Sequence, residues 1–180
     1  MNIDEPRPAE NSPRIWLSII SALAACAGSL WLSLGMDLKA CPLCLYQRAC
    51  IFCAATVLIL ATMLRKQDPA TIGSLALAPA VAGLAVGIYH VVLESAGTLE
   101  CPRGIGGIGS APQQAVVAEI LVVAVLVLAA LPRWSGVLLA TGLGIAVGSM
   151  LIRSAPPLPP KPEKPYTAPL DICRPRYVAS

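Results

Sequence analysis

The sequence predicts an all-α fold, a polytopic helix bundle embedded in a membrane. Hydrophobic residues make up 56% of the 180-residue chain, and charged residues only 13%. The mean hydropathy is +0.72, and apolar runs of roughly twenty residues, enough to cross a bilayer as a helix, recur along the chain. The net charge of +3 is modest, and nothing resembles a basic nucleic-acid-binding patch.

Five apolar runs are the predicted spans. They cover residues 15–35, 43–64, 71–93, 115–131 and 134–152. The last two are short and separated only by Pro132 and Arg133. We expect a tight hairpin of two spans there, because roughly 17 apolar residues already suffice to cross. A single re-entrant excursion is the alternative. The predicted architecture is therefore a four-helix core with a fifth span.

Charges near the span ends set the expected orientation. Arg14, the Arg65–Lys66 pair and Arg133 fall on one side, which is the cytoplasmic side by the positive-inside rule. Residues 1–14 are then a cytoplasmic N-terminus. The opposite face is the oxidising, extracytoplasmic one, where disulfides persist. Four loop or boundary cysteines gather on that face: Cys41, Cys44, Cys101 and Cys173.

Residues 153–180 form a tail of different composition. Eight prolines fall between Pro156 and Pro175, which favours an extended, disordered, polyproline-like tether. With five spans, this tail is on the extracytoplasmic side. About 20 residues at ~3.1 Å each would let Cys173 reach most of that face. A tail with an incidental cysteine is the alternative.

The stretch CPLCLYQR, residues 41–48, opens the second span. Two cysteines separated by two residues can close a small disulfide, and this spacing is the usual one for thiol exchange. A helix that starts at Pro42 favours a thiolate on Cys44 near its N-terminus. Arg48 shares a helical face with Cys41 and Cys44, and we expect its charge to favour that thiolate further. The stretch predicts a redox centre at a membrane surface.

The remaining cysteines divide by position. Three lie inside spans, where cysteine behaves as a small hydrophobic residue; these are Cys26, Cys50 and Cys53. Pairing Cys41 with Cys44 leaves Cys101 to pair with Cys173. Unpaired Cys101 and Cys173 are the alternative.

Three ionisable side chains lie just inside the spans near the extracytoplasmic face. Arg48 is roughly one turn inside the second span, where an arginine is costly and is taken as functional, with snorkelling to the interface as the alternative. His90 is the only histidine. It could bind a ligand carbonyl or shuttle protons, and a structural role is equally open. For Glu119 in the fourth span both a functional and a structural role are also open, and the structural role is favoured.

Two other kinds of site are not expected. Residues 104–109 match G-x-G-x-x-G, but no strand precedes them, so a dinucleotide site is rejected. A metal site at Cys41 and Cys44 lacks a second local cysteine or histidine pair. Covalent haem attachment would need histidine where Leu45 stands.

An apolar span followed at once by C-x-x-C-x-Y-x-R at residues 41–48 resembles the bacterial disulfide-bond formation protein B (DsbB) family. The resemblance covers residues 15–101. It implies a four-helix membrane bundle in the bacterial inner membrane. It also implies an enzyme that reoxidises a periplasmic DsbA-like thiol oxidase and passes electrons to a membrane quinone, either ubiquinone or menaquinone.

The family pattern implies roles for individual residues. Cys44 would lie next to the quinone, and Cys41 would exchange with the second disulfide. Arg48 matches the family arginine that assists the quinone, and His90 is a loose positional match that we assign to quinone binding. Cys101 corresponds to the loop cysteine that the partner attacks.

One departure from the family pattern follows Cys101. The family usually places both cysteines of its second pair in this loop, and the chain has one there. We expect Cys173 on the tail to supply the missing one. Two other functions are considered: an oxidoreductase similar to vitamin K epoxide reductase, whose C-x-x-C comes late rather than early, and a non-enzymatic membrane assembly protein.

Overall fold

The structure, a computed structural model, describes residues 12–64 and 68–177. Its helices are α1 (Pro13–Leu34), α2 (Pro42–Met63), α3 (Pro69–Ser95), α4 (Ala111–Ala130) and α5 (Trp134–Ser154). Two 3-10 turns, η2 (Ile105–Gly107) and η3 (Leu131–Arg133), and two short strands, β1 (Leu99–Glu100) and β2 (Arg174–Pro175), complete the described elements. The predicted all-α helix bundle is confirmed. Residues 1–11 and the Arg65–Lys66 pair, which contribute to the predicted orientation, lie outside the described residues.

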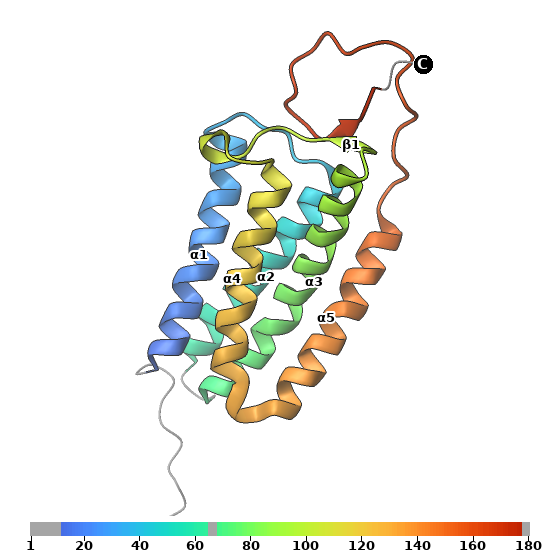
Figure 1. The fold of residues 1–180 in the computed structure, drawn as a ribbon. Helices are drawn as coiled ribbons and strands as arrows, with labels where there is room; N and C mark the ends of the chain where they lie inside the picture. Colours follow the sequence, from blue (N-terminus) through green and yellow to red (C-terminus); the bar gives the residue numbers. More distant parts are fainter. Residues whose placement is uncertain (1–11, 65–67, 178–180) are drawn as a thin grey trace, which may run out of the picture.

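Helix α3 occupies the centre of the bundle. It packs against α2, α4 and α5, while α1 contacts α2 and α4 (Figure 1). Glycines four residues apart bring α5 close to α3. A Cβ at Gly144 would lie 2.6 Å from the Ala78 carbonyl oxygen, and one at Gly148 would lie 2.8 Å from Ala85 Cβ. Close approach through small residues is a common way for helices to associate in membranes.

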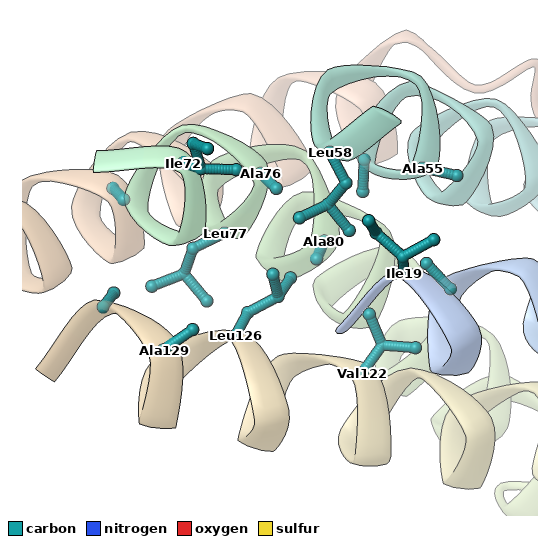
Figure 2. Close-up of a cluster of buried hydrophobic side chains, with 14 of the residues drawn as sticks. Ile19, Ala55, Leu58, Ile72, Ala76, Leu77, Ala80, Val122, Leu126 and Ala129 are labelled. Atoms are coloured by element: carbon teal, nitrogen blue, oxygen red, sulfur yellow. The ribbon is translucent and has the colours of Figure 1, made fainter. Parts of the chain in front are cut away.

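The core of the bundle is filled by branched and small apolar side chains from α1 to α4. Figure 2 shows Ile19, Leu58, Leu77 and Leu126 converging from these four helices. Leu58, Leu77 and Leu126 are fully buried. Alanines of α2 and α3 fill the space between them, so the helices pack closely.

The helices are long and apolar enough to cross a membrane. The described residues contain four such stretches, the last being the 44-residue run Ala111–Ser154. The turn η3 folds this run into α4 and α5, a hairpin of helices of 20 and 21 residues (Figure 1). Each is about 30 Å long, the thickness of a bilayer core. Large apolar side chains, Leu121 and Leu139 among them, are exposed on the outward helix faces, as a lipid-facing surface requires.

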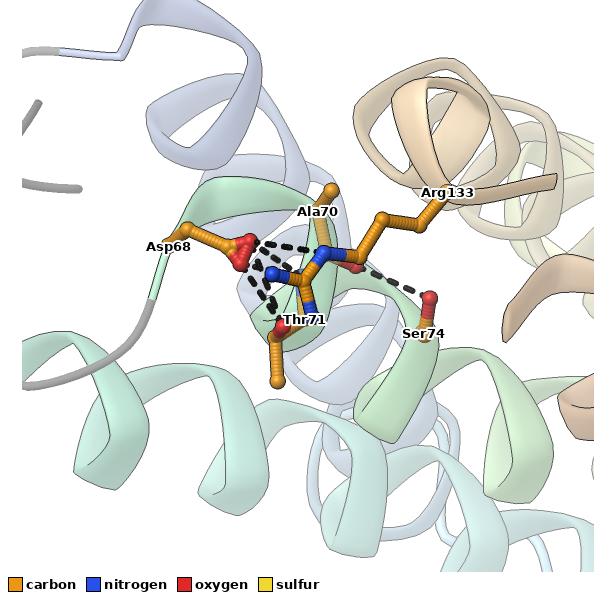
Figure 3. Close-up of polar contacts among 5 residues, drawn as sticks. All are labelled: Asp68, Ala70, Thr71, Ser74 and Arg133. Atoms are coloured by element: carbon orange, nitrogen blue, oxygen red, sulfur yellow. Dashed lines mark hydrogen bonds and ion pairs between the residues drawn. The ribbon is translucent and has the colours of Figure 1, made fainter. Parts of the chain in front are cut away.

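The turn between α4 and α5 contacts the start of α3 through an ion pair. Asp68 caps α3 by accepting hydrogen bonds from the backbone N–H and the hydroxyl of Thr71. Arg133 Nε lies 3.3 Å from Asp68 Oδ1, and Ser74 donates to the Ala70 carbonyl (Figure 3). These contacts hold the end of the bundle that is remote from Cys41 and Cys44.

The tail returns across the other end of the bundle (Figure 1). Residues 155–165 have no helix or strand, but β2 pairs antiparallel with β1, with Leu99 opposite Pro175 and Glu100 opposite Arg174. The expectation of a disordered tail therefore needs correction at its end. Composition alone indicates an extended chain there and does not reveal the partner strand that holds it.

Candidate active site

Cys41 and Cys44 form a close dithiol at the start of α2. Cys41 is the N-cap of the helix, and Pro42 occupies the first turn, where its missing N–H costs nothing. The Cys44 backbone N–H donates to Cys41 Sγ at 3.3 Å, and the two Sγ atoms lie 2.9 Å apart. A disulfide bond is ~2.05 Å long, so the pair can close with a movement of about 1 Å.

In this dithiol the Cys44 thiol stabilises a thiolate on Cys41, whereas the sequence pattern predicted the thiolate on Cys44. The hydrogen bond accepted from the Cys44 thiol, helped by His90 and opposed by burial, lowers the pKa of Cys41 to about 4. The Cys44 backbone N–H makes a smaller contribution, and it reaches Cys41 because that residue is the N-cap. The N-cap side chain is the one that accepts from the unpaired N–H groups of the first turn.

Arg48 reaches from α2 to α1. Its Nε donates to Ser29 Oγ at 2.8 Å, and its Nη2 donates to the Ser29 carbonyl and to Ser33 Oγ, both at 2.9 Å. These partners are neutral, and within the described residues the guanidinium has no carboxylate partner. Neither serine was expected at the site. Two serines four residues apart in an apolar span share a helix face, and that spacing would have marked them.

A cavity of about 390 Å³ lies beside Cys44, between α1, α2 and α4. Its walls are mostly apolar, and Arg48 lines it together with Cys44. Small residues of α1 leave the space: a Cβ at Gly28 would meet no atom within 4 Å. Gln47 and Glu119 also line the cavity, and both are buried.

His90 lies among sulfur atoms of both cysteine pairs. It is fully buried, with Nε2 3.5 Å from Cys101 Sγ and 3.9 Å from Cys41 Sγ, and Nδ1 3.9 Å from Cys44 Sγ. It does not line the cavity beside Cys44. The expectation that His90 binds a quinone stays a prediction, and in this structure its ring contacts the thiols.

Cys101 and Cys173 are joined by a disulfide across 72 residues of sequence. The expected pairing is present in the structure. Cys101 lines a hollow on the outer surface together with exposed Arg103. Cys173 instead lines the inner cavity with Cys44. The two halves of this disulfide thus border different spaces.

Contacts of the next residue hold Cys173 in place. Arg174 Nε lies 2.6 Å from Glu100 Oε1, and the guanidinium stacks 3.8 Å from the centre of the Tyr166 ring. Tyr166 Oη donates to the Pro175 carbonyl at 3.0 Å. The end of the tail is therefore fixed beside β1 by charge, aromatic and backbone contacts together.

The fold also brings Cys173 and His90 to the Cys41–Cys44 pair. Ligand atoms of these four residues all lie within 4.8 Å of one another. The sequence has no second local pair, but the fold brings two further possible ligands to the dithiol. However, Cys173 Sγ is bonded to Cys101, so the four are not a set of free metal ligands here. Their spacing instead suits thiol exchange, because a sulfur of one pair lies close to both sulfurs of the other.

The family model for the disulfide bond formation protein DsbB matches residues 12–121, more than half of the chain. The chain belongs to the DsbB family. No curated protein and no solved structure matches it. As a DsbB-family member, it is a membrane oxidoreductase of disulfide-bond formation. The DsbB match includes Cys41, Cys44 and Cys101 and ends within α4, so α5 and Cys173 lie outside it.

Proposed function

We propose that this DsbB-family protein is a protein-dithiol:quinone oxidoreductase. It reoxidises a DsbA-like thiol oxidase on the periplasmic side of the bacterial inner membrane and passes the electrons to a membrane quinone, ubiquinone or menaquinone. The observation that carries the proposal is the meeting of both cysteine pairs at one end of the bundle, beside an apolar cavity lined by Cys44.

The residues around the cavity suit a quinone headgroup. The volume of about 390 Å³ lies within the ~300–1,000 Å³ typical of small-molecule sites. Nη1 of Arg48 has no hydrogen-bond partner within the described residues and can donate to a carbonyl oxygen. A quinone bound there would supply the net oxidising capacity that thiol exchange alone lacks.

The outer exchange begins at Cys101, because this half of the disulfide borders the surface hollow. A thiolate of the partner attacks Cys101 Sγ, the Cys101–Cys173 bond breaks, and a mixed disulfide forms. The second thiol of the partner then displaces Cys101. The partner leaves with a disulfide, and Cys101 and Cys173 retain its two electrons.

The inner exchange moves those electrons to the first pair. The Cys173 thiolate, within 4.8 Å of Cys41 Sγ, attacks Cys41 of the oxidised Cys41–Cys44 pair and releases a Cys44 thiolate. Cys44 then carries the charge in the cavity that Arg48 lines. Attack of Cys101 on Cys173 restores the outer disulfide and leaves Cys41 and Cys44 reduced.

His90 supports both exchanges as a hydrogen-bond donor. Its two ring nitrogens face Cys101, Cys41 and Cys44 at 3.5–3.9 Å. A thiolate that forms at one of these sulfurs can accept a hydrogen bond from the imidazole, and the ring can carry a proton between them. His90 is thus assigned to thiol exchange and not to the quinone.

The same arrangement supports an orientation of the bundle in the membrane. Four cysteines of the relay lie at one end of the bundle, and Arg14 and Arg133 lie toward the other. We place the cysteine end in the periplasm, because disulfides persist in oxidising compartments and basic residues favour the cytoplasmic side. The hairpin of α4 and α5 then brings the tail back to the periplasmic face.

Quinone reduction by purified protein in lipid nanodiscs tests the proposal. With a reduced DsbA-like partner, one quinone should be reduced for each partner dithiol oxidised, and ubiquinone and menaquinone analogues should be compared. Cys44→Ala should lower this rate at least about 100-fold. Cys53→Ala, which alters an exposed cysteine of the same helix, is the matched control. Partner oxidation without quinone reduction would contradict the proposal.

A further inference from the structure

A buried carboxyl group lies in the wall of the inner cavity and has no part in the thiol relay. Glu119 is 4% exposed, and its Oε2 accepts a hydrogen bond from Gln47 Nε2 at 2.9 Å. Gln47 follows Cys44 by three residues in α2, or ~4.5 Å along the helix axis. The carboxyl group is therefore about one helical turn below the cysteine that borders the same cavity.

Two glycines of α3 make the space for this carboxyl–amide pair. A Cβ at Gly83 would lie 2.9 Å from Glu119 Oε1, and a Cβ at Gly87 would lie 2.5 Å from Gln47 Nε2 and 3.0 Å from Glu119 Oε2. Any larger residue at either position would displace the pair. The bundle thus contains a pocket shaped around two polar side chains at membrane depth, where polar groups are costly and usually functional.

Within the described residues, the second carboxyl oxygen of Glu119, Oε1, accepts no hydrogen bond. It lies beside Gly83 of α3, and the glutamate lines the cavity beside Cys44. Arg48, the nearby cation, directs its hydrogen bonds to α1 instead. A carboxyl group without a counter-ion in such a site favours the neutral acid.

We propose that Glu119 is the proton donor for quinone reduction at this site. This inference rests on the proposed function. Reduction of a quinone to a quinol consumes two electrons and two protons. Oxidation of the Cys41 thiolate and the Cys44 thiol to a disulfide supplies both electrons and one proton, and water supplies the second proton. Glu119 gives one proton from its carboxyl group to a quinone oxygen and regains the one released by the Cys44 thiol, so it ends each turnover unchanged.

Glu119→Gln separates this role from a structural one. The glutamine carbonyl can still accept from Gln47 Nε2, so the contact between α2 and α4 is kept while the acidic proton is lost. We expect quinone reduction to slow roughly 100-fold, the usual size of a general-acid contribution, with quinone affinity changed less than about twofold. Glu119→Asp should restore a measurable part of the rate, and Glu163→Gln, an exposed change on the tail, should have no effect.

Two readouts do not depend on the steady-state rate of quinone reduction. Exchange between the reduced partner and the Cys101–Cys173 disulfide should be unchanged in Glu119→Gln, which shows that the variant is folded. Infrared difference spectra should contain a carboxylic-acid C=O band that is absent from Glu119→Gln and changes on quinone reduction. A Glu119→Gln rate equal to that of the wild type, or an ionised Glu119 before reduction, would overturn the inference alone. A wild-type protein that reduces no quinone would overturn the proposed function as well.

Discussion

The two cysteine pairs meet at one end of the bundle but are built in different ways. Cys41 and Cys44 are three residues apart, and their geometry follows from the first turn of one helix. Cys101 and Cys173 are 72 residues apart and are brought together by strand pairing, an ion pair and the hairpin of α4 and α5. One pair is a local feature, and the other depends on the whole fold.

The two pairs also differ in how far the family match covers them. The part of the chain that matches the DsbB family, residues 12–121, holds the local pair and Cys101. Cys173 comes from outside that part, yet its sulfur lies within 4.8 Å of the sulfurs of Cys41 and Cys44. A loop cysteine can therefore be replaced by one on a tail, provided that an extra helix returns the tail to the same face. A long excursion of the tail is not needed for exchange.

The largest expected effect comes from removing the distant cysteine. In Cys173→Ser, quinone reduction driven by the DsbA-like partner should fall more than about 100-fold, because the relay between the pairs is broken. Reduction driven by a small dithiol should persist, since that reagent can act on Cys41–Cys44 directly. Both rates are measured from quinone absorbance, with Cys53→Ser as control. Persisting partner-driven turnover would mean that Cys101 passes electrons without Cys173.

A second expected effect tests the local pair. In the reduced protein a Cys41 pKa of about 4 makes the rate of Cys41 alkylation flat from about pH 5 upward, and the rate falls as pH drops through 4. Cys44→Ala removes the thiol whose hydrogen bond lowers the pKa of Cys41, so the pKa should rise toward the usual ~8.5. Alkylation of the Cys41 peptide at pH 6, followed by mass spectrometry, should slow at least about tenfold.

Cys44→Ser is the matched control for that measurement. Its hydroxyl can still donate a hydrogen bond to Cys41, so much of the lowered pKa should remain. A Cys41 alkylation profile that is unchanged in Cys44→Ala would instead assign the lowered pKa to His90, which lies 3.9 Å from Cys41 Sγ. The expected order of rates at pH 6 is therefore wild type, Cys44→Ser, Cys44→Ala.

The sequence was informative where chemistry is local. The C-x-x-C spacing and Arg48 one turn further lie on a single helix, so their mutual position follows from helix geometry. The fold class followed from hydropathy for a similar reason, because each span is determined by its own composition. The pairing of Cys101 with Cys173 was reachable only by counting cysteines on one face.

Features that depend on contacts between helices were not predictable in this way. Ser29 and Ser33 hold Arg48 across α1 and α2, and nothing in the sequence fixes how those helices are rotated. The placement of Glu119 against Gln47 depends on glycines of a third helix. The thiolate was expected on Cys44 because the helix was taken to favour a residue inside its first turn. In the structure Cys41 accepts a hydrogen bond from the Cys44 thiol and, as the N-cap, a second one from the Cys44 backbone N–H.

A smaller effect is expected from loosening the tail. Arg174 is 17% exposed and pairs with Glu100, so Arg174→Ala removes a partly buried ion pair and the stacking on Tyr166, together worth roughly 1 kcal/mol. The Cys101–Cys173 disulfide should then become about fivefold easier to reduce, because the contacts that keep its sulfurs together are weaker. Equilibration against a dithiol buffer measures this, with Lys164→Ala as control. An unchanged equilibrium would mean that β1–β2 pairing alone fixes the tail.

The smallest effect is expected at Lys39, which contacts the tail through both its backbone and its side chain. Its backbone N–H donates to the Asp171 carbonyl at 2.8 Å, and its Nζ lies 2.7 Å from Asp171 Oδ2. The hydrogen bond from Lys39 lowers the pKa of Asp171, so the side-chain pair contributes above the usual aspartate pKa and is lost as pH falls through the lowered value. The lysine is 70% exposed, and exposed ion pairs contribute little to stability.

Lys39→Ala keeps the backbone hydrogen bond and should shift the reduction equilibrium of the Cys101–Cys173 disulfide less than twofold at pH 7. A shift as large as that of Arg174→Ala would mean that exposed side chains, and not the strand and its partly buried arginine, hold Cys173 beside the local pair.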